Sequence, residues 1–117
     1  MADEFGAQKA LLRWEESAEI LLIDASHGIA RAQRLLAFRY LHGRGVPKDE
    51  AVAFYWMQLA AQQHFPMAQR SLGELYESGF GIALDMTLAC HWYGLAALQG
   101  DSTAKEHLQR LAPANTS

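Results

Sequence analysis

Two arginines, Arg34 and Arg70, are the side chains of this sequence best suited to recognising a charged ligand. They lie 36 residues apart, and each ends the tripeptide Ala-Gln-Arg. A guanidinium presents a planar fork that can bind both oxygens of a carboxylate. We expect the two arginines to be neighbours on adjacent helices. They either bind an acidic side chain or chain terminus of a partner, or lie solvated or paired within the chain.

Other reactive side chains have spacings that do not indicate catalysis or metal binding. Cys90 and His91 are adjacent, so on a helix their side chains diverge by about 100° and cannot easily share a metal. No serine, histidine and acid set has the spacing of a nucleophilic site. The two Gly-x-Gly segments join predicted helices, whereas a phosphate-binding loop follows a strand. We therefore expect no enzyme activity, no metal and no cofactor.

The spacing of the two arginines is part of a repeat that covers most of the chain. Aligning residues 32–64 with residues 68–100 without a gap gives fourteen identities, among them Tyr40 with Tyr76 and Trp56 with Trp92. Periods of roughly 20 to 50 residues are typical of solenoids, in which each unit buries its apolar face against its neighbours. Solenoids of this kind usually bind other chains.

Each unit is predicted to contain two helices. Apolar and small residues recur three or four positions apart within each half-unit, as at Ala32, Leu36 and Tyr40. The turns between the halves contain paired glycines, which can adopt the left-handed conformation that ends a helix. Asp49 and Asp85 should then cap the second helices, which we expect near residues 49–63 and 85–99.

We expect one all-α domain, a right-handed α-α superhelix of six or seven antiparallel helices. Residues 1–28 form an N-terminal capping helix, strongest near residues 7–26 and broken near Glu16. The two repeats span residues 29–64 and 65–100, a C-terminal capping helix spans residues 101–112, and residues 113–117 are a tail. The N-terminal stripe includes Leu11, Trp14 and Leu21.

Composition excludes several classes of protein. Half of the residues are hydrophobic and the net charge is −3, so the chain should fold and has no general attraction to nucleic acid or anionic membranes. The longest apolar run, Ile20 to Ile23, is far shorter than a membrane span. A lone cysteine, Cys90, cannot form an intrachain disulfide and suits a reducing compartment. With an acidic start at Met1, these features predict a cytoplasmic protein.

The second unit resembles a Sel-one-like repeat, a relative of the tetratricopeptide repeat. The resemblance rests on an ordered set of residues in both units, with departures at Ala37, Met57 and His64 in the first. In the second unit these residues are Leu72-Gly73, Tyr76, Gly79, Gly81, Asp85, Trp92-Tyr93 and Ala96-Ala97. The resemblance implies a noncatalytic solenoid, common in bacteria, that acts as an adaptor and holds a protein or peptide partner on its concave face. Some bacterial members resemble immunity proteins, so an immunity or inhibitor protein that neutralises an effector or toxin enzyme is the alternative.

The predicted binding face is the side of the first helices next to the stripe that enters the stack. Thr103, Glu106 and Arg110 of the last helix and Ser78 of the second repeat belong to the same face. The candidate partner-binding residues are Arg31, Arg34, Phe38, Leu41, His42, Met67, Arg70, Glu74 and Glu77.

Aromatic residues divide into a predicted core and one candidate anchor. Trp56, Trp92, Tyr40, Tyr76 and Tyr93 recur at helical spacing and are assigned to the core. Phe38 replaces Glu74 of the next unit, so it either anchors a partner in the groove or packs against the N-terminal helix. Self-association through the open ends, at Phe5, Leu11, Leu12 or Leu111, makes a homodimer a further possibility.

Overall fold

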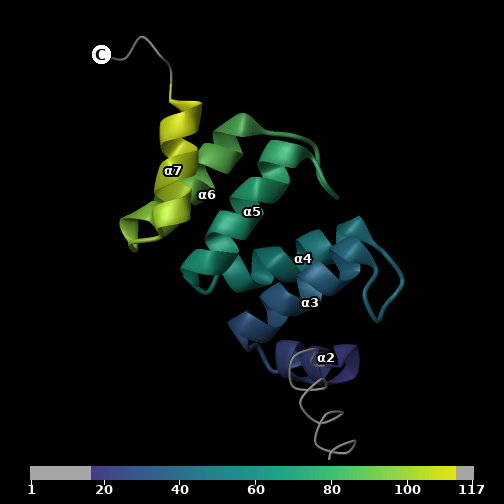
Figure 1. Ribbon diagram of the computed structural model, residues 1–117. Coiled ribbons are helices and arrows are strands. Elements are labelled where there is room, and N and C mark those ends of the chain that lie inside the picture. Colours follow the sequence, from purple (N-terminus) through teal and green to yellow (C-terminus); the bar gives the residue numbers. More distant parts are fainter. Residues whose placement is uncertain (1–16, 113–117) are drawn as a thin grey trace, which may run out of the picture.

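The computed structural model describes residues 17–112 as a stack of antiparallel helices (Figure 1), and in that range no β-strand occurs. Residues 1–16 of the predicted N-terminal capping helix and the predicted tail at 113–117 lie outside the described range. The helices are α2 (Ala18–Ser26), α3 (Ala30–His42), α4 (Glu50–Ala61), α5 (Pro66–Ser78), α6 (Met86–Leu98) and α7 (Ser102–Leu111). This all-α solenoid is the predicted fold class.

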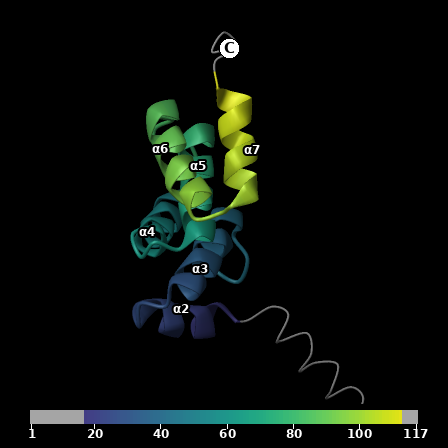
Figure 2. The ribbon, with the colours of Figure 1, turned by 90° about the vertical axis from the view of Figure 1, so that its left-hand side faces the viewer.

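The helices form two layers along the stack. In Figure 2, α3, α5 and α7 lie in one layer and α2, α4 and α6 in the other, with α2 and α7 at opposite ends of the described chain. Each helix packs against the next one in sequence, and α3 also packs against α5. The first helices of successive units therefore make a continuous surface.

Short polar side chains cap four of the helices. Asp49 and Asp85 occupy the N-cap positions of α4 and α6, and their carboxylates accept hydrogen bonds from Val52 N at 3.1 Å and Leu88 N at 3.0 Å. Ser17 caps α2, and Asp101 caps α7. These contacts give the repeated aspartates the structural role predicted for them.

The paired-glycine turns end α3 and α5 in the same way. Gly43 and Gly79 have φ angles of 67° and 78°, which place both in the left-handed region. The amides of Asp49 and Asp85 then donate to the carbonyls of Tyr40 and Tyr76, each at 2.9 Å. The turn thus ties the start of each second helix to the end of the first.

Small residues allow the helices to pack closely. The core contains alanines at equivalent positions of the two units, such as Ala53 with Ala89 and Ala60 with Ala96, all at most 1 % exposed. Tyr76 and Tyr93 are buried, whereas Tyr40, Trp56 and Trp92 are partly buried and pack against the core. The aromatic series therefore belongs to the packed interior and its border.

Two buried glutamines connect the successive units. The Gln33 side chain donates to the Ala25 carbonyl at 3.0 Å and accepts from Gln63 Nε2 at 2.7 Å. Gln69 repeats this arrangement, since it donates to the Ala61 carbonyl and accepts from Gln99 at 2.7 Å. A buried amide needs such partners, which explains why both glutamine pairs recur in the sequence.

Candidate functional site

An open groove runs across the layer formed by α3, α5 and α7. It encloses about 510 Å³, within the size range of ligand-binding clefts. The groove is lined by Phe38, Leu41, Ser71, Glu74, Leu75, Glu77, Ser78, Phe80, His107 and Arg110.

The part of the groove between α3 and α5 is apolar. Phe38 and Leu41 come from α3, Leu75 comes from α5, and Phe80 comes from the following turn. Phe38 is partly buried and packs against the main core, and Phe80 is 50 % exposed. A partner's apolar side chain could therefore be removed from water here.

The part between α5 and α7 is charged, and its carboxylates are paired. Glu77 accepts from Arg110 Nη1 at 2.7 Å, and Glu74 lies 3.0 Å from His107 Nε2. Tyr93 donates to Glu77 Oε1 at 2.7 Å, and its ring lies 4.7 Å from the His107 ring. These contacts join α7 to the second repeat along one edge of the groove.

The pKa values of two groups in this network shift for identifiable reasons. The hydrogen bond from Arg110 lowers the pKa of the Glu77 carboxyl, and the Tyr93 hydrogen bond lowers it further, against the opposing effect of burial. Burial raises the pKa of the Tyr93 phenol, and the neighbouring Glu77 adds to that rise. Tyr93 therefore stays protonated and serves as a donor.

Arg34 and Arg70 do not line the groove, although Arg34 contacts two of its residues, and the two arginines have different partners. Arg70 Nε donates to both carboxylate oxygens of Asp101, at 3.1 and 3.2 Å. Arg34 Nε donates to Ser71 Oγ at 3.2 Å, and its guanidinium carbon lies 4.8 Å from the Phe38 ring centroid. Arg70 is thus paired within the chain, which is one of the two alternatives predicted for these arginines.

The structure brings some of the predicted binding residues together and leaves others outside the groove. Phe38, Leu41, Glu74 and Glu77 line it, as do Ser78 and Arg110 of the same predicted face. His42 is exposed and stacks on Phe38, with ring centroids 6.5 Å apart. Outside the groove, Arg31 and Met67 are exposed, and Arg34 and Arg70 are partly buried.

Four residues of the groove were not predicted from the sequence. These residues are Ser71, Leu75, Phe80 and His107. In the sequence, Leu75 and His107 fit no binding pattern by themselves. Phe80 carried a usable signal, because the equivalent residue of the first unit is Arg44 and a departure from the repeat at an exposed turn favours a binding role. Ser71 and Leu75 are buried on α5, and His107 reaches the groove from α7, so the packing of three helices brings these residues together.

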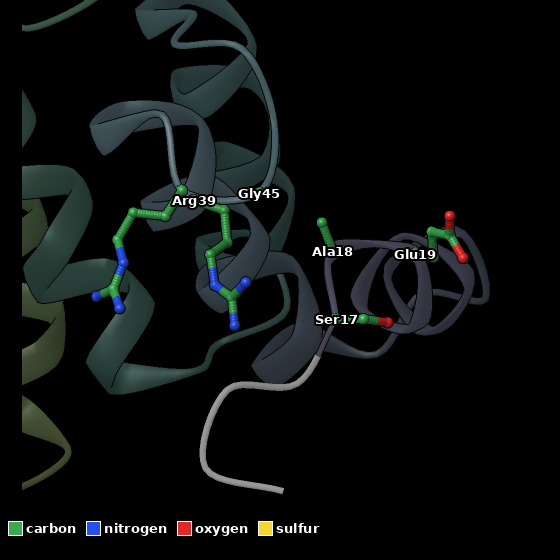
Figure 3. Close-up of a pocket in the computed structure, with 6 residues that line it drawn as sticks. Ser17, Ala18, Glu19, Arg39 and Gly45 are labelled. Carbon is green, nitrogen blue, oxygen red and sulfur yellow. The ribbon is translucent and has the colours of Figure 1, made fainter. Parts of the chain in front are cut away.

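Two further hollows lie outside the groove. One, of about 560 Å³, lies beside the start of α2 and is lined by Ser17, Ala18, Glu19, Arg39, Arg44 and Gly45. Figure 3 shows the Glu19 carboxylate directed away from Arg39. The second, of about 550 Å³, lies between α6 and α7 and includes Cys90, Leu98 and Leu108.

The described part of the chain has neither a metal-binding cluster nor a membrane-spanning helix. Between Ser17 and Ala112, no three side chains of the histidine, cysteine, aspartate and glutamate types are grouped so that they could hold a metal ion. No helix of the same range is long and apolar enough to cross a membrane.

The family comparison identifies the repeat. The model of the Sel1 repeat matches twice, at residues 30–65 and 66–101. These matches include α3 to α6 and the caps and turns described above. A search of curated proteins finds no match.

Solved structures show the same fold. A Sel1 repeat protein from Oxalobacter formigenes is 48 % identical, with a TM-score of 0.74 over 77 % of this chain and 68 % of that one. The protein c5321, described as a protective antigen present in uropathogenic Escherichia coli strains and displaying an SLR fold, is 33 % identical with a TM-score of 0.78. That alignment covers 80 % of this chain but only 20 % of c5321.

Proposed function

This chain belongs to the Sel1 repeat family, and from that premise we propose that it is a noncatalytic adaptor that binds a segment of a partner protein in the groove. Sel1 repeat proteins are generally scaffolds for protein interaction. We place its action in the cytoplasm of a bacterial cell, because both similar structures come from bacteria and the lone Cys90 suits a reducing compartment.

The observation that carries this proposal is the apolar surface between α3 and α5. It combines side chains from two repeats, since Phe38 and Leu41 belong to the first, whereas Leu75 and Phe80 belong to the second. Exposed aromatic side chains beside a charged border are typical of interface anchors. The surrounding pairs, Glu74 with His107 and Glu77 with Arg110, would supply the polar border.

A matched pair of aromatic substitutions tests this proposal. Phe80 in the groove is 50 % exposed and Tyr55 on α4, outside the groove, is 55 % exposed. We expect Phe80→Ala to lose a partner captured by the wild-type protein from native lysate, while Tyr55→Ala retains it. Circular dichroism and a thermal melt of each variant establish that both are folded. Retention of the partner by Phe80→Ala would exclude the groove as the binding surface.

The same experiment separates an adaptor from an immunity or inhibitor protein. An adaptor leaves the captured protein's own activity intact. If the partner were instead an enzyme whose activity is abolished by one equivalent of this chain, the inhibitor function would replace the adaptor function. Phe80→Ala would then relieve the inhibition, which identifies the groove as the inhibitory surface.

A further inference from the structure

Arg34 and Arg70 have different partners because the N-cap residues of α5 and α7, which are equivalent positions of successive repeats, differ. Asp101 caps α7 and pairs with Arg70 at 3.1 Å. Phe65 occupies the equivalent position at α5 and makes no side-chain cap hydrogen bond. Arg70 is thus paired with an aspartate. Its equivalent in the first repeat, Arg34, has no aspartate at the corresponding position.

Arg34 is held in a defined position and is partly removed from water. Its Nε donates to Ser71 Oγ, and its guanidinium group lies over the Phe38 ring, an arrangement in which a cation is attracted to the ring face. Burial lowers the pKa of Arg34, and the positive charge of Arg70 lowers it further. A carboxylate placed beside Arg34 would oppose both effects.

The negative charges of Glu74 and Asp101 partly offset the lowering of the pKa of Arg34, but these carboxylates and Glu77 on the same helix layer already have cationic partners. Asp101 pairs with Arg70, Glu77 pairs with Arg110, and Glu74 lies 3.0 Å from His107. Among residues 17–112, no carboxylate lies within salt-bridge distance of Arg34. Arg34 is therefore a positive charge of this surface that a partner's carboxylate can neutralise.

We propose that Arg34 binds an aspartate or glutamate side chain of the partner segment, while the residue next to that acid places an apolar side chain against Phe38 and Leu75. The Arg70–Asp101 pair supplies the template for the contact, with a carboxylate side chain meeting the guanidinium of the equivalent arginine. Because Ser71 and Phe38 hold Arg34 in place, little side-chain freedom is lost when the acid binds. This inference rests on the proposed function, because it specifies the chemistry of the segment bound in the groove.

A pair of isosteric peptides tests the role of the carboxylate. The probes are N-acetyl-Asp-Phe-amide and N-acetyl-Asn-Phe-amide, titrated into the full ¹⁵N-labelled chain and followed by NMR. We expect both peptides to shift backbone signals near Leu41, Leu75 and Phe80. Only the aspartyl peptide should shift the Arg34 Nε–H signal, and it should bind about tenfold more tightly, since hydrogen bonds between charged groups are stronger than neutral ones.

Two arginine substitutions provide the matched controls. Arg34→Gln should abolish the preference for the aspartyl peptide, whereas Arg31→Gln, which removes the same charge from an exposed position of α3, should retain it. A backbone ¹H–¹⁵N spectrum of each variant verifies the fold.

The outcomes distinguish this inference from the proposed function. Equal binding of both peptides in the groove would overturn the role of Arg34 and leave the groove as a binding surface. Preference for the aspartyl peptide with shifts at Arg70 or Arg110, and none at Arg34, would also overturn the inference. If neither peptide shifts any signal of the groove, both the inference and the proposed surface are contradicted.

Discussion

Gly73 on α5 lies directly against the ring of Tyr93 on α6. A methyl group at Gly73 would come within 2.7 Å of the Cδ1 and Cε1 atoms of Tyr93 and 3.1 Å of the Ala89 carbonyl oxygen. In the first repeat the equivalent residues are Ala37 and Met57, each 1 % exposed. A larger residue on one helix therefore accompanies a smaller ring-free residue on the other. Ala37 and Met57, which both depart from the family pattern, thus compensate for each other in size at the position of the Gly73–Tyr93 contact.

The Gly73–Tyr93 contact predicts coupled effects on stability. Gly73→Ala should lower the free energy of unfolding by about 1–3 kcal/mol through overpacking, despite the better helix propensity of alanine. In a Tyr93→Met background the same substitution should cost much less, because the ring has been removed. Urea unfolding followed by circular dichroism gives the four values of this cycle. Strict additivity would mean that the two positions are not in steric contact.

Alanine substitutions at Gly45 and Gly81, the second glycine of each turn, should lower stability by different amounts. Gly45 and Gly81 have similar φ angles of 78° and 74°, so alanine strains the backbone at both. A methyl group at Gly81 would also overlap the Glu50 backbone carbonyl, whereas at Gly45 its nearest neighbours lie at 3.6 Å. Gly81→Ala should therefore lower the melting temperature more than Gly45→Ala. Equal losses would show that backbone strain alone sets the cost.

His64 predicts a stabilising substitution. Its φ angle is 63°, while Gly28 and Gly100, one repeat before and after it, have φ angles of 85° and 98°. A residue with a Cβ atom is strained in this region by about 1–2 kcal/mol, so His64→Gly should raise the free energy of unfolding by up to about 1 kcal/mol. The control, His91→Gly in the middle of α6, should lower it by roughly 0.3–0.5 kcal/mol, the difference in helix propensity between histidine and glycine. Chemical denaturation of both variants checks the opposite signs.

The hydrogen bonds of Glu77 should make part of the free energy of unfolding depend on pH in the acidic range. The Arg110 and Tyr93 hydrogen bonds lower its folded-state pKa below the unfolded value. The stabilisation is therefore present above the unfolded pKa of a glutamate, about 4.3, and is lost as the pH falls through the folded-state pKa. Glu77→Gln should narrow the difference in urea midpoint between pH 7 and pH 3. The effect should be small because solvent screens the Arg110 partner, and an unchanged difference would contradict the assignment.

Local features of the sequence were sufficient to predict the helices and their ends. Asp49 and Asp85 cap helices that begin at the next residue, and Gly43 and Gly79 end the preceding ones. These features depend on the residues within one turn of the chain, where backbone conformation and capping are decided. The 36-residue period then implies that the same element is stacked again.

The groove could be predicted only in part. Phe38, Leu41, Glu74 and Glu77 were placed on the binding face because helical periodicity assigns faces. Leu75 and His107 were not, because Leu75 is a buried core residue that still borders the groove, and His107 is brought to it by its contact with Glu74 on another helix. Periodicity states which side of a helix a residue occupies, but it does not state how far the next helix covers that side.

Arg34 and Arg70 show where the information in the sequence ends. The sequence by itself determined that they are equivalent residues on equivalent helices, since identity at a fixed period needs no coordinates. Only the tertiary structure decided that Arg70 pairs with Asp101 while Arg34 lies over Phe38 and bonds to Ser71. An ion pair requires atoms within about 4 Å, and for residues 31 positions apart helix packing sets that distance.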